Sequence, residues 1–459
     1  MRHPVGGEVV RGIGRGIEIG VGIGTGDGRG RAGGHRPETG GRRAPCTGRA
    51  SRRAGTAALA AFGALVGTLA GAGGAAADAR GMRYDHVERP APGVTFGNFT
   101  VTAARRTVHG HLLTVRLVTR GLGVDLLTPG AVAGRATVSR LADARHAVAA
   151  VNGDFFDISE EQHPGVAATG SADGPEIASG RVLKAAVPDA QRFGPALPPG
   201  ATSRDVLGVG TDHRARLDRL TFDGSVRTSR AAYPLRGYNQ FALPGNGIGA
   251  YTADWGARSR RRAVCGSDTS RAAGCSADTY EVAVRGQRVV SVAPQPGAGR
   301  IPAGTTVLLG RDAGADALRS ALRVGDRVQV SGRLVRAPSG IRYTFAVGGV
   351  PVLRNGRPLA GLDTTTAATR TAAGFGGGGA TLYLLALDGG AESHAGLTLA
   401  ELAAVLRRIG ADNAVNLDGG GSSTLVTRAR GRRSAAVRNH PSGGAERPVA
   451  NAIGILAPR

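Results

Sequence analysis

One stretch near the C-terminal end of the chain constrains the fold more than any other. Residues 413–426 read NAVNLDGGGSSTLV, in which an alternating apolar run leads into Asp418, three glycines, two serines and more apolar residues. The apolar run predicts a buried strand, and the glycines allow backbone angles that other residues avoid. Consecutive N–H groups in such a turn can form an anion-binding nest, to which Ser422 and Ser423 add hydroxyl groups. A tight turn between two strands explains part of the pattern, but not the carboxylate at the strand's exit.

Other segments share this plan, in which a predicted strand ends at a polar residue. The segment ATVSRLADARHAVAAVN predicts a short helix and a buried strand that runs into NGDFFD at 152–157, and TLYLLALDGG predicts a strand that ends on Asp388. The next segment predicts an amphipathic helix with Thr398 as its cap, Glu401 in the capping-box position and Gly410 as its stop. Strands that each end at an acidic or amide residue, with helices between them, imply an α+β fold in which several strand ends converge on one cleft. We expect a mixed sheet with packed helices and a β-rich insertion lobe.

The length of the chain and its composition shifts suggest more than one domain. A chain of 459 residues exceeds one ordinary small domain. A Pro- and Gly-rich stretch marks a boundary near residue 200, and β-like segments follow up to about residue 345. The expected parts are a disordered leader with a secretory signal (1–79), the N-terminal part of the main domain (80–204), a β-rich insertion (205–345) and a C-terminal part with the glycine-rich motif (346–459).

The start of the chain predicts a secretory signal. Residues 1–45 are rich in Gly and Arg and have no apolar period. Arg49, Arg52 and Arg53 then precede an apolar run that ends in small residues, which is the order found in signal peptides. We expect cleavage near Ala77 and a secreted or cell-wall-associated protein without stable membrane association. An uncleaved membrane anchor is the alternative.

The charge of the chain limits its partners. The net charge is +24, and nearly all the positive charge is arginine because Lys184 is the single lysine. The arginines are scattered, aromatic residues make up 4% of the chain, and no nucleic-acid-binding motif is present. We therefore expect no nucleic-acid partner. A compositional bias toward Ala, Gly and Arg explains most of the charge, but a basic surface would also favour anionic substrates such as phosphate-bearing polymers.

The cysteines predict one disulfide. Cys265 and Cys275 lie ten residues apart in a polar loop, and in an exported chain such a pair closes a small loop. Two free thiols are the alternative. Neither residue belongs to a metal-ligand pattern, so zinc is not expected.

Several motifs resemble, in sequence and in order, the phosphodiester glycosidase domain family. They are VNGDFF, ASGRVL, VGGVPVLRNG, TRTAAG, YLLALDGG, GLTLAELAAVLRRIGADNAVNLDGGGSSTL and RPVANAIGI. The similarity covers roughly residues 145–457, with a less patterned insertion at 205–345. The resemblance implies hydrolysis of a sugar-1-phosphodiester, N-acetylglucosamine-like in character, that releases the sugar and leaves a phosphomonoester.

The resemblance also implies which residues form the site. Asp418 is the first candidate for the carboxylate that activates water or attacks the anomeric carbon, and Asp388 is the second. Asn152 would orient the substrate, and Arg370 would clamp the phosphate through its guanidinium group. Asp154 joins the catalytic set, although family members often have glycine at this position. The remaining expected binding residues are Gly153, Thr371, Gly419, Gly420, Gly421, Ser422, Ser423, Arg447 and Asn451.

Two other functions and one cofactor stay open at this point. A non-catalytic cell-wall polysaccharide-binding protein would retain the fold, but Trp255 is the only tryptophan and no repeats are present. A phosphodiesterase that cuts the other P–O bond would normally use a metal pair, and clustered histidines are scarce. The acids could also hold a divalent cation such as calcium, although no EF-hand loop or regular metal spacing is present.

Overall fold

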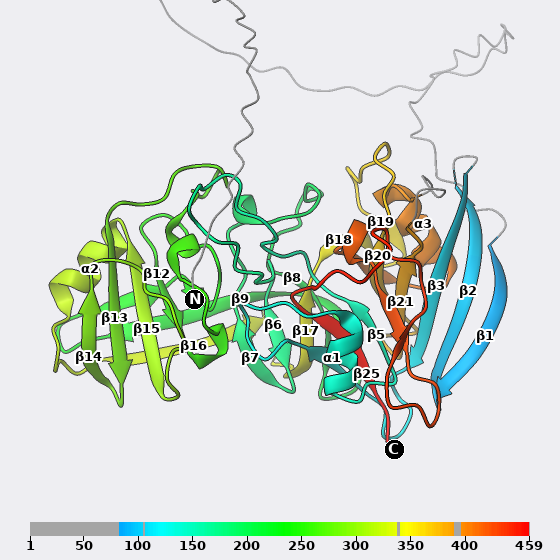
Figure 1. The fold of residues 1–459 in the computed structure, drawn as a ribbon, viewed down its shortest axis with the longest axis horizontal. Coiled ribbons are helices and arrows are strands. Elements are labelled where there is room, and N and C mark those ends of the chain that lie inside the picture. Colours follow the sequence, from blue (N-terminus) through cyan, green and yellow to red (C-terminus); the bar gives the residue numbers. More distant parts are fainter. Residues whose placement is uncertain (1–81, 104–105, 337–339, 390–395, 459) are drawn as a thin grey trace, which may run out of the picture. The chain divides into compact units, whose positions relative to one another are not determined.

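The computed structural model describes residues 82–458, with gaps at 104–105, 337–339 and 390–395. All described elements belong to one compact unit. The described residues form 25 strands, three α-helices and four 3-10 helices (Figure 1). The predicted secretory signal lies outside the described residues.

The expected α+β class is wrong, because the described part of the chain is a β-rich fold. The two predicted helices do form, as α1 (Val138–Ala144) and α3 (Leu399–Arg408), and the described residues form a third helix, α2 (Ala313–Ala321). With seven, nine and ten residues, however, they are too short and too few to make layers of their own. The sheets also differ from expectation, since β11 with β12 is the only parallel pair among the strand pairs of the described residues. The 3-10 helices are η1 (Asp189–Gln191), η2 (Ala253–Trp255), η3 (Arg261–Val264) and η4 (Gly420–Ser422).

An eight-stranded antiparallel sheet forms one layer. Its strands, in spatial order, are β1 (Arg83–Ala91), β2 (Val94–Ala103), β3 (Arg106–Arg116), β21 (Thr381–Leu387), β20 (Thr371–Gly376), β22 (Asn413–Leu417), β18 (Val350–Arg354) and β19 (Arg357–Pro358). Both faces of its central strands are buried, because Leu384 and Val415 enter one core while Leu385 and Ala414 enter a second core. Helix α3 covers this second face (Figure 1).

A five-stranded antiparallel sheet packs against the first. Its order is β24 (Ala436–Val437), β23 (Leu425–Thr427), β5 (Ala149–Asn152), β25 (Ala452–Leu456) and β4 (Gly123–Leu127). Val151, Leu425 and Ile453 from this sheet share the core that Leu384 and Val415 enter from the other, so the two sheets face each other. Helix α1 covers the outer face of the five-stranded sheet.

Two further sheets contain most of the middle of the chain. The seven-stranded sheet runs β10 (Ala232–Leu235), β9 (Ala215–Arg227), β8 (Asp205–Gly210), β17 (Tyr343–Gly348), β6 (Glu176–Ala178) and β7 (Arg181–Lys184), with β16 (Gln329–Arg336) paired to β9. The other sheet runs β11 (Gly237–Tyr238), β12 (Ile248–Tyr251), β15 (Thr305–Arg311), β13 (Thr279–Arg285) and β14 (Arg288–Ala293), and packs against α2. The chain leaves β8 at Gly210 and returns to pair with it at Tyr343. The insertion bounds of 205 and 345 stay a prediction.

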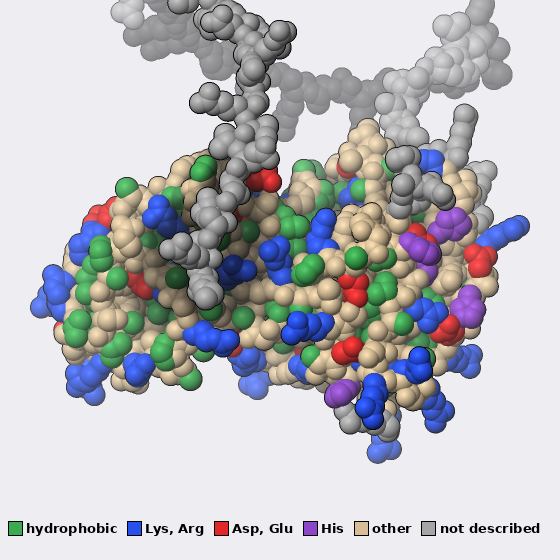
Figure 2. Space-filling model, in the orientation of Figure 1, with side chains coloured by type: hydrophobic (Ala, Val, Ile, Leu, Met, Phe, Trp, Pro, Cys, Tyr) green, Lys and Arg blue, Asp and Glu red, His purple; other side chains and the backbone are tan. Residues whose placement is uncertain are grey.

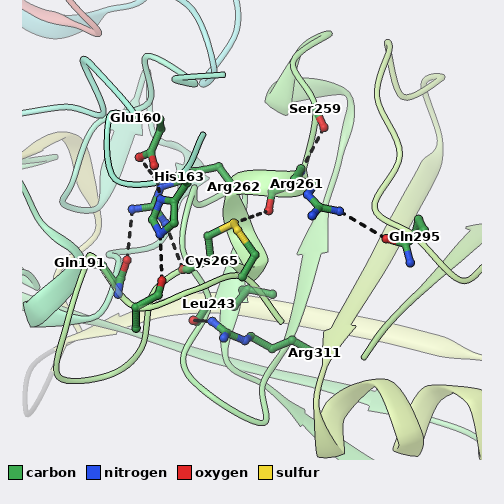
Figure 3. Close-up of a disulfide and its surroundings, with 12 residues drawn as sticks. Glu160, His163, Gln191, Leu243, Ser259, Arg261, Arg262, Cys265, Gln295 and Arg311 are labelled. Carbon is green, nitrogen blue, oxygen red and sulfur yellow. Dashed lines mark hydrogen bonds and ion pairs between the residues drawn. A yellow bond between two sulfur atoms is a disulfide. The ribbon is translucent and has the colours of Figure 1, made fainter. Parts of the chain in front are cut away.

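The predicted disulfide between Cys265 and Cys275 is confirmed. Its loop packs on a buried pair of side chains, Glu160 and His163, that lie in the segment after β5 (Figure 3). The two form a short contact through His163 Nδ1, and His163 Nε2 lies 2.9 Å from the carbonyl oxygen of Ala273, inside the disulfide loop. The disulfide loop and the segment after β5 therefore stabilise each other.

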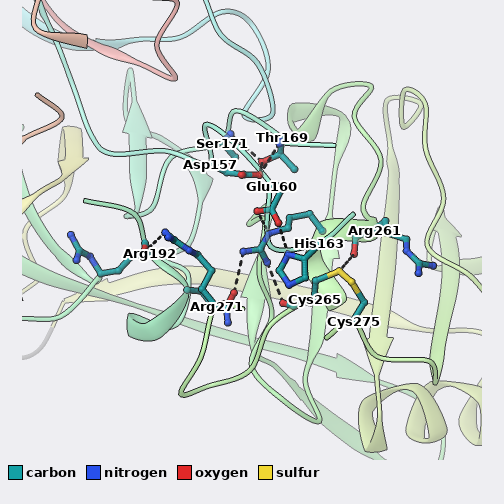
Figure 4. Close-up of polar contacts among 12 residues, drawn as sticks. Asp157, Glu160, His163, Thr169, Ser171, Arg192, Arg261, Cys265, Arg271 and Cys275 are labelled. Carbon is teal, nitrogen blue, oxygen red and sulfur yellow. Dashed lines mark hydrogen bonds and ion pairs between the residues drawn. A yellow bond between two sulfur atoms is a disulfide. The ribbon is translucent and has the colours of Figure 1, made fainter. Parts of the chain in front are cut away.

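A buried arginine, Arg262, extends this cluster (Figure 3), and Figure 4 shows Asp157 and Thr169 next to Glu160. The Arg262 guanidinium pairs with Glu160 and donates to Gln191 Oε1 at 3.1 Å. Beside it, Asp157 Oδ2 accepts two hydrogen bonds of 2.7 Å from the backbone and hydroxyl of Thr169. Burial nevertheless raises the pKa of Asp157 to about 7. These contacts fix the chain just beyond the end of β5.

Candidate active site

Strand pairing brings three predicted residues to one edge of the eight-stranded sheet. Strand β20 lies between β21 and β22 and is antiparallel to both, with Thr371 opposite Ala386 and Leu417. The start of β20 therefore meets the ends of its two neighbours. Arg370, Asp388 and Asp418, which lie just outside these strands, come together at this edge. Two strand spacings separate the backbones at Asp388 and Asp418, or about 10 Å.

The side chain of Asn152 joins the end of β5 to this edge. Its Nδ2 donates to the carbonyl oxygen of Asp418 at 2.7 Å. Its Oδ1 accepts from Thr371 Oγ1 at 2.9 Å and from the Thr424 backbone at 3.0 Å. Asn152 is fully buried, and its amide group thus connects both sheets. These hydrogen bonds hold the two sheets together at the candidate site, and a role of Asn152 in orienting a substrate stays a prediction.

The next two residues are held by Asn451. Gly153 donates its N–H to the carbonyl oxygen of Asn451 at 3.0 Å, and Asp154 donates its N–H to Asn451 Oδ1 at 3.0 Å. A Cβ atom on Gly153 would lie 2.0 Å from Asn451 Oδ1, so this position needs glycine. The Asp154 carboxylate points into the protein and accepts from the backbone N–H groups of Phe155 and Gly174 at 2.9 and 2.7 Å.

Asp418 is partly exposed and has an unusual pKa. Burial raises the pKa of its carboxyl group to about 6, although a hydrogen bond with Ser422 and the positive charge of Arg447 oppose the rise. The negative charge of Asp154 also contributes to the rise. A carboxyl group with this pKa can exchange a proton near neutral pH, which is typical of catalytic acids and bases.

The glycine-rich loop forms the 3-10 helix η4 instead of an open nest. The N–H of Gly419 donates to Asp418 Oδ1 at 3.0 Å, and that of Gly420 to the carbonyl oxygen of Thr369 at 2.8 Å. Ser422 and Ser423 donate their N–H groups back to Gly419 and Gly420. Gly420 has a φ of +57°, which favours glycine. Of the five N–H groups from Gly419 to Ser423, only that of Gly421 has no acceptor among the described residues.

The hydroxyl groups of Thr371 and Ser423, behind the glycine-rich loop, are buried and hydrogen-bonded within the protein. Thr371 Oγ1 lies 2.9 Å from Ser423 Oγ, and Asn439 Nδ2 donates to the carbonyl oxygen of Ser423 at 2.9 Å. Thr371 and Ser423 are both fully buried. Like Asn152, Thr371 and Ser423 form hydrogen bonds that connect the ends of neighbouring strands.

Asp388 is held as an anion by two histidines that sequence reasoning missed. His111 Nε2 lies 2.9 Å from Asp388 Oδ1, and the backbone N–H of His440 donates to the same oxygen at 2.7 Å. His111 in turn contacts Asn98 Oδ1 through Nδ1 at 3.0 Å. Burial alone would raise the pKa of Asp388, but these hydrogen bonds outweigh it and lower the pKa. No motif surrounds His111 or His440 in the sequence, so their position beside Asp388 could not be predicted from it.

The two predicted arginines differ in how much of their guanidinium group is available. Arg370 is mostly buried and donates from Nε to the carbonyl oxygen of Leu397 at 2.9 Å and from Nη2 to that of Thr366 at 2.8 Å. Arg447 is exposed, and its Nη1 lies 3.4 Å from Ser422 Oγ, next to Asp418. Arg447 is therefore better placed to meet an anion.

A buried charge cluster, which sequence reasoning also missed, lies behind Asp154. Asp173 and Glu176 are buried here with Lys184, whose Nζ donates to three carbonyl oxygens, those of residues 173, 174 and 185, at 2.6–3.3 Å. Glu176 Oε1 accepts from Asn451 Nδ2 at 2.6 Å, whereas its Oε2 is buried without a hydrogen-bond partner among the described residues. Burial raises the pKa of Glu176 to about 7, against the opposing charge of Lys184. Asn451 links this cluster to the site.

The predicted substrate-binding and catalytic residues thus lie in one region around Asp418 and Asn152, whereas the disulfide lies in a separate loop. Among the described residues, no group of three or more His, Cys, Asp or Glu side chains is arranged to hold a metal ion. A calcium requirement stays a prediction.

Comparison with known proteins confirms the resemblance over part of the chain. Residues 278–456, less than half of the chain, match the family model for phosphodiester glycosidase. No curated protein matches the sequence. The fold is similar to that of a hypothetical protein from Synechocystis, with a TM-score of 0.63 and 19% identity over 82% of this chain and 64% of that one, or less than two thirds of its length. It is also similar to a protein from Burkholderia pseudomallei K96243 described as exported, with a TM-score of 0.57 and 24% identity over 76% and 74% of the two chains.

A third similarity is weaker. The catalytic domain of zebrafish N-acetylglucosamine-1-phosphodiester alpha-N-acetylglucosaminidase, auto-inhibited by its pro-peptide, aligns with 16% identity over 83% of this chain and 88% of that one. Its TM-score of 0.39 is too low to bear on the fold of this chain.

Glu176 should make the stability of the protein depend on pH. Its pKa of about 7 in the folded state exceeds the ordinary value of 4.5, so the native state binds more protons between these values. Stability should therefore fall as pH rises through this window, by up to about 3 kcal/mol from Glu176. Glu176→Gln should gain stability relative to wild type between pH 5 and pH 8, as measured by chemical denaturation. Glu161→Gln, at an exposed position, is the control. If the unfolding free energy of wild type and of Glu176→Gln varied with pH in parallel, this role of Glu176 would be refuted.

Proposed function

We propose that this protein, whose residues 278–456 match the phosphodiester glycosidase family, hydrolyses sugar-1-phosphodiesters. Water attacks the anomeric carbon, the bond between that carbon and the bridging oxygen breaks, and the oxygen leaves with the phosphate. The products are the free sugar and a phosphomonoester. The substrate class is an N-acetylglucosamine-like glycosyl phosphodiester.

The observation that carries this proposal is the contrast between two carboxyl groups at one sheet edge. The pKa of Asp418 is raised to about 6, while that of Asp388 is lowered. Environments that push two such pKa values apart support separate roles for the two groups. At neutral pH Asp418 is largely deprotonated and can take a proton from water, whereas Asp388 stays anionic and can stabilise the positive charge that develops on the sugar ring. Phosphate is a good leaving group, so the reaction needs no strong acid.

The phosphate group is assigned to Arg447 and to the end of the glycine-rich loop. The exposed guanidinium group of Arg447 lies next to Ser422, and the N–H of Gly421 has no acceptor among the described residues. Both suit phosphate oxygens. Arg370 contributes mainly by holding the carbonyl groups of Thr366 and Leu397 and so fixing the start of β20.

The proposed setting is outside the cytoplasm, on sugar-phosphate or cell-wall glycans. The sequence pattern of the leader and the disulfide support export. No helix in the described part of the chain is long and apolar enough to cross a membrane.

Replacing Asp418 tests the proposed reaction. Asp418→Asn should lower kcat by about 10²- to 10⁴-fold, because it removes the group that accepts a proton from water. In the wild type, kcat/KM should fall as pH drops below about 6 and Asp418 becomes protonated. The measurement is product release from an N-acetylglucosamine-1-phosphodiester, with thermal unfolding to verify the fold.

Asp412→Asn provides the matched control, since Asp412 is exposed and lies at the opposite end of β22. Full activity of Asp418→Asn would remove Asp418 from its role. Release of sugar-1-phosphate would indicate a phosphodiesterase, and glycan binding without any product would indicate a binding protein.

Arg447 should be the main contact for the phosphate. Arg447→Ala should raise KM by about tenfold, the loss expected for one charge-assisted hydrogen bond. Arg354→Ala, at an exposed position in β18, should leave KM unchanged. Steady-state kinetics on the same diester provides the measurement, and an unchanged KM for Arg447→Ala would contradict the assignment.

A further inference from the structure

We propose that a second, arginine-lined cavity binds linear polyanions that carry several phosphate groups. The cavity has a volume of about 1380 Å³, and none of its lining residues belongs to the site around Asp418. The inference is independent of the hydrolase reaction, because it concerns binding at another place on the molecule.

The cavity lies where the edges of the two facing sheets approach each other. One wall is the turn between β1 and β2, at residues 89–95, together with Thr114 and Arg116 of β3. The opposite wall is the loop between β23 and β24, at residues 428–433. His146, Val148 and the chain at 457–458 complete the lining.

The lining is strongly basic. It contains no Asp or Glu, and its charged residues are Arg89, Arg116, Arg428, Arg430, Arg432 and Arg433, with His146 beside them. Arg428 pairs with Asp143 at 2.7 Å. No carboxylate among the described residues pairs with the other five guanidinium groups. Figure 2 shows blue Lys and Arg side chains gathered at the lower right of the surface, around the C-terminal end marked in Figure 1.

Internal contacts hold both walls in place without using these five arginines. Arg438, beside β24, pairs with Glu88 of β1 through two contacts of 2.6 and 3.0 Å, and its guanidinium lies 4.3 Å from the centre of the Phe96 ring. At the base of the loop, Arg428 Nε donates to the carbonyl oxygen of Ala147 at 3.1 Å. The basic recess is thus formed before a ligand arrives, which lowers the cost of binding.

The dimensions favour a chain of phosphates over a single ion or a membrane. The volume exceeds the 300–1,000 Å³ of a usual small-molecule site, and unpaired arginines come from three separate segments of the chain. Such spacing can neutralise several phosphates along one polymer and release their counterions. A recess between two loops fits a narrow chain better than a flat bilayer.

The cavity and the candidate active site lie at opposite ends of the same pair of strands. Ala149 pairs with Thr427 next to the cavity loop, whereas Asn152 and Thr424 lie at the active-site end. Three residues of strand separate these ends, or about 10 Å.

Binding of inorganic polyphosphate to the full chain tests the proposal. The variant Arg430→Ala/Arg432→Ala/Arg433→Ala should weaken polyphosphate binding at least tenfold at physiological salt. The slope of log K (the association constant) against log salt concentration should become smaller in magnitude by about 2 to 3. The matched control is Arg227→Ala/Arg230→Ala/Arg300→Ala, which removes three exposed arginines elsewhere and should weaken binding less than twofold. Thermal unfolding should be unchanged in both variants, because none of the substituted side chains has an ion-pair partner in the part of the chain that the structure describes.

Each alternative outcome overturns the proposal in a different way. Equal weakening by both triple variants would show that overall charge, not the cavity, binds the polymer. Competition by inorganic phosphate at the same phosphate concentration would indicate a single-ion site. Binding to phosphatidylglycerol vesicles without binding to polyphosphate would indicate a membrane contact. Hydrolysis of a small diester should be the same in the cavity variant and the wild type. A failure of the polyphosphate-binding proposal can therefore be told apart from a failure of the hydrolase proposal.

Discussion

The amide group of Asn152 is the connection on which the candidate site depends. It hydrogen-bonds to the backbone of Asp418, to the hydroxyl of Thr371 and to the backbone of Thr424, and so ties the end of β5 to the edge of the opposite sheet. Apolar contacts between the two sheets are non-directional, whereas fully satisfied buried hydrogen bonds specify how the strand ends meet. The relative placement of the residues at this edge follows from these hydrogen bonds.

Electrostatics then divides the roles at the edge. Asp388 receives hydrogen bonds from two histidines and stays anionic, whereas Asp418 has weaker support and a raised pKa. Behind them, Asp154 adds negative charge that the protein balances with its single lysine, Lys184. The buried lysine thus limits the electrostatic cost of a site built from acids. In the proposed reaction, Arg447, on the exposed side, would contact the phosphate of the substrate.

Local patterns in the sequence predicted local structure well. Asp418 follows the predicted strand, Thr398 and Glu401 form the predicted capping box, and Cys265 pairs with Cys275. The fold class was wrong because the helices are too short and too few to make a layer of their own, and because helix and strand patterns do not reveal how strands pair. For the same reason the sequence could not show that the Arg370 guanidinium group donates hydrogen bonds to backbone carbonyl groups. Nor could it show that most N–H groups of the glycine-rich loop donate to acceptors within the protein. His111 and Glu176 reach the site through pairing between distant segments, which no local motif encodes.

The central claim is that water attacks the anomeric carbon, and isotope labelling tests it most directly. Breaking the phosphorus–oxygen bond on the sugar side would give the same two products, so product identity alone does not decide the point. Hydrolysis of an N-acetylglucosamine-1-phosphodiester in water enriched in oxygen-18, followed by mass spectrometry, separates the two routes. The account predicts the label in the sugar. Label in the phosphomonoester would contradict it.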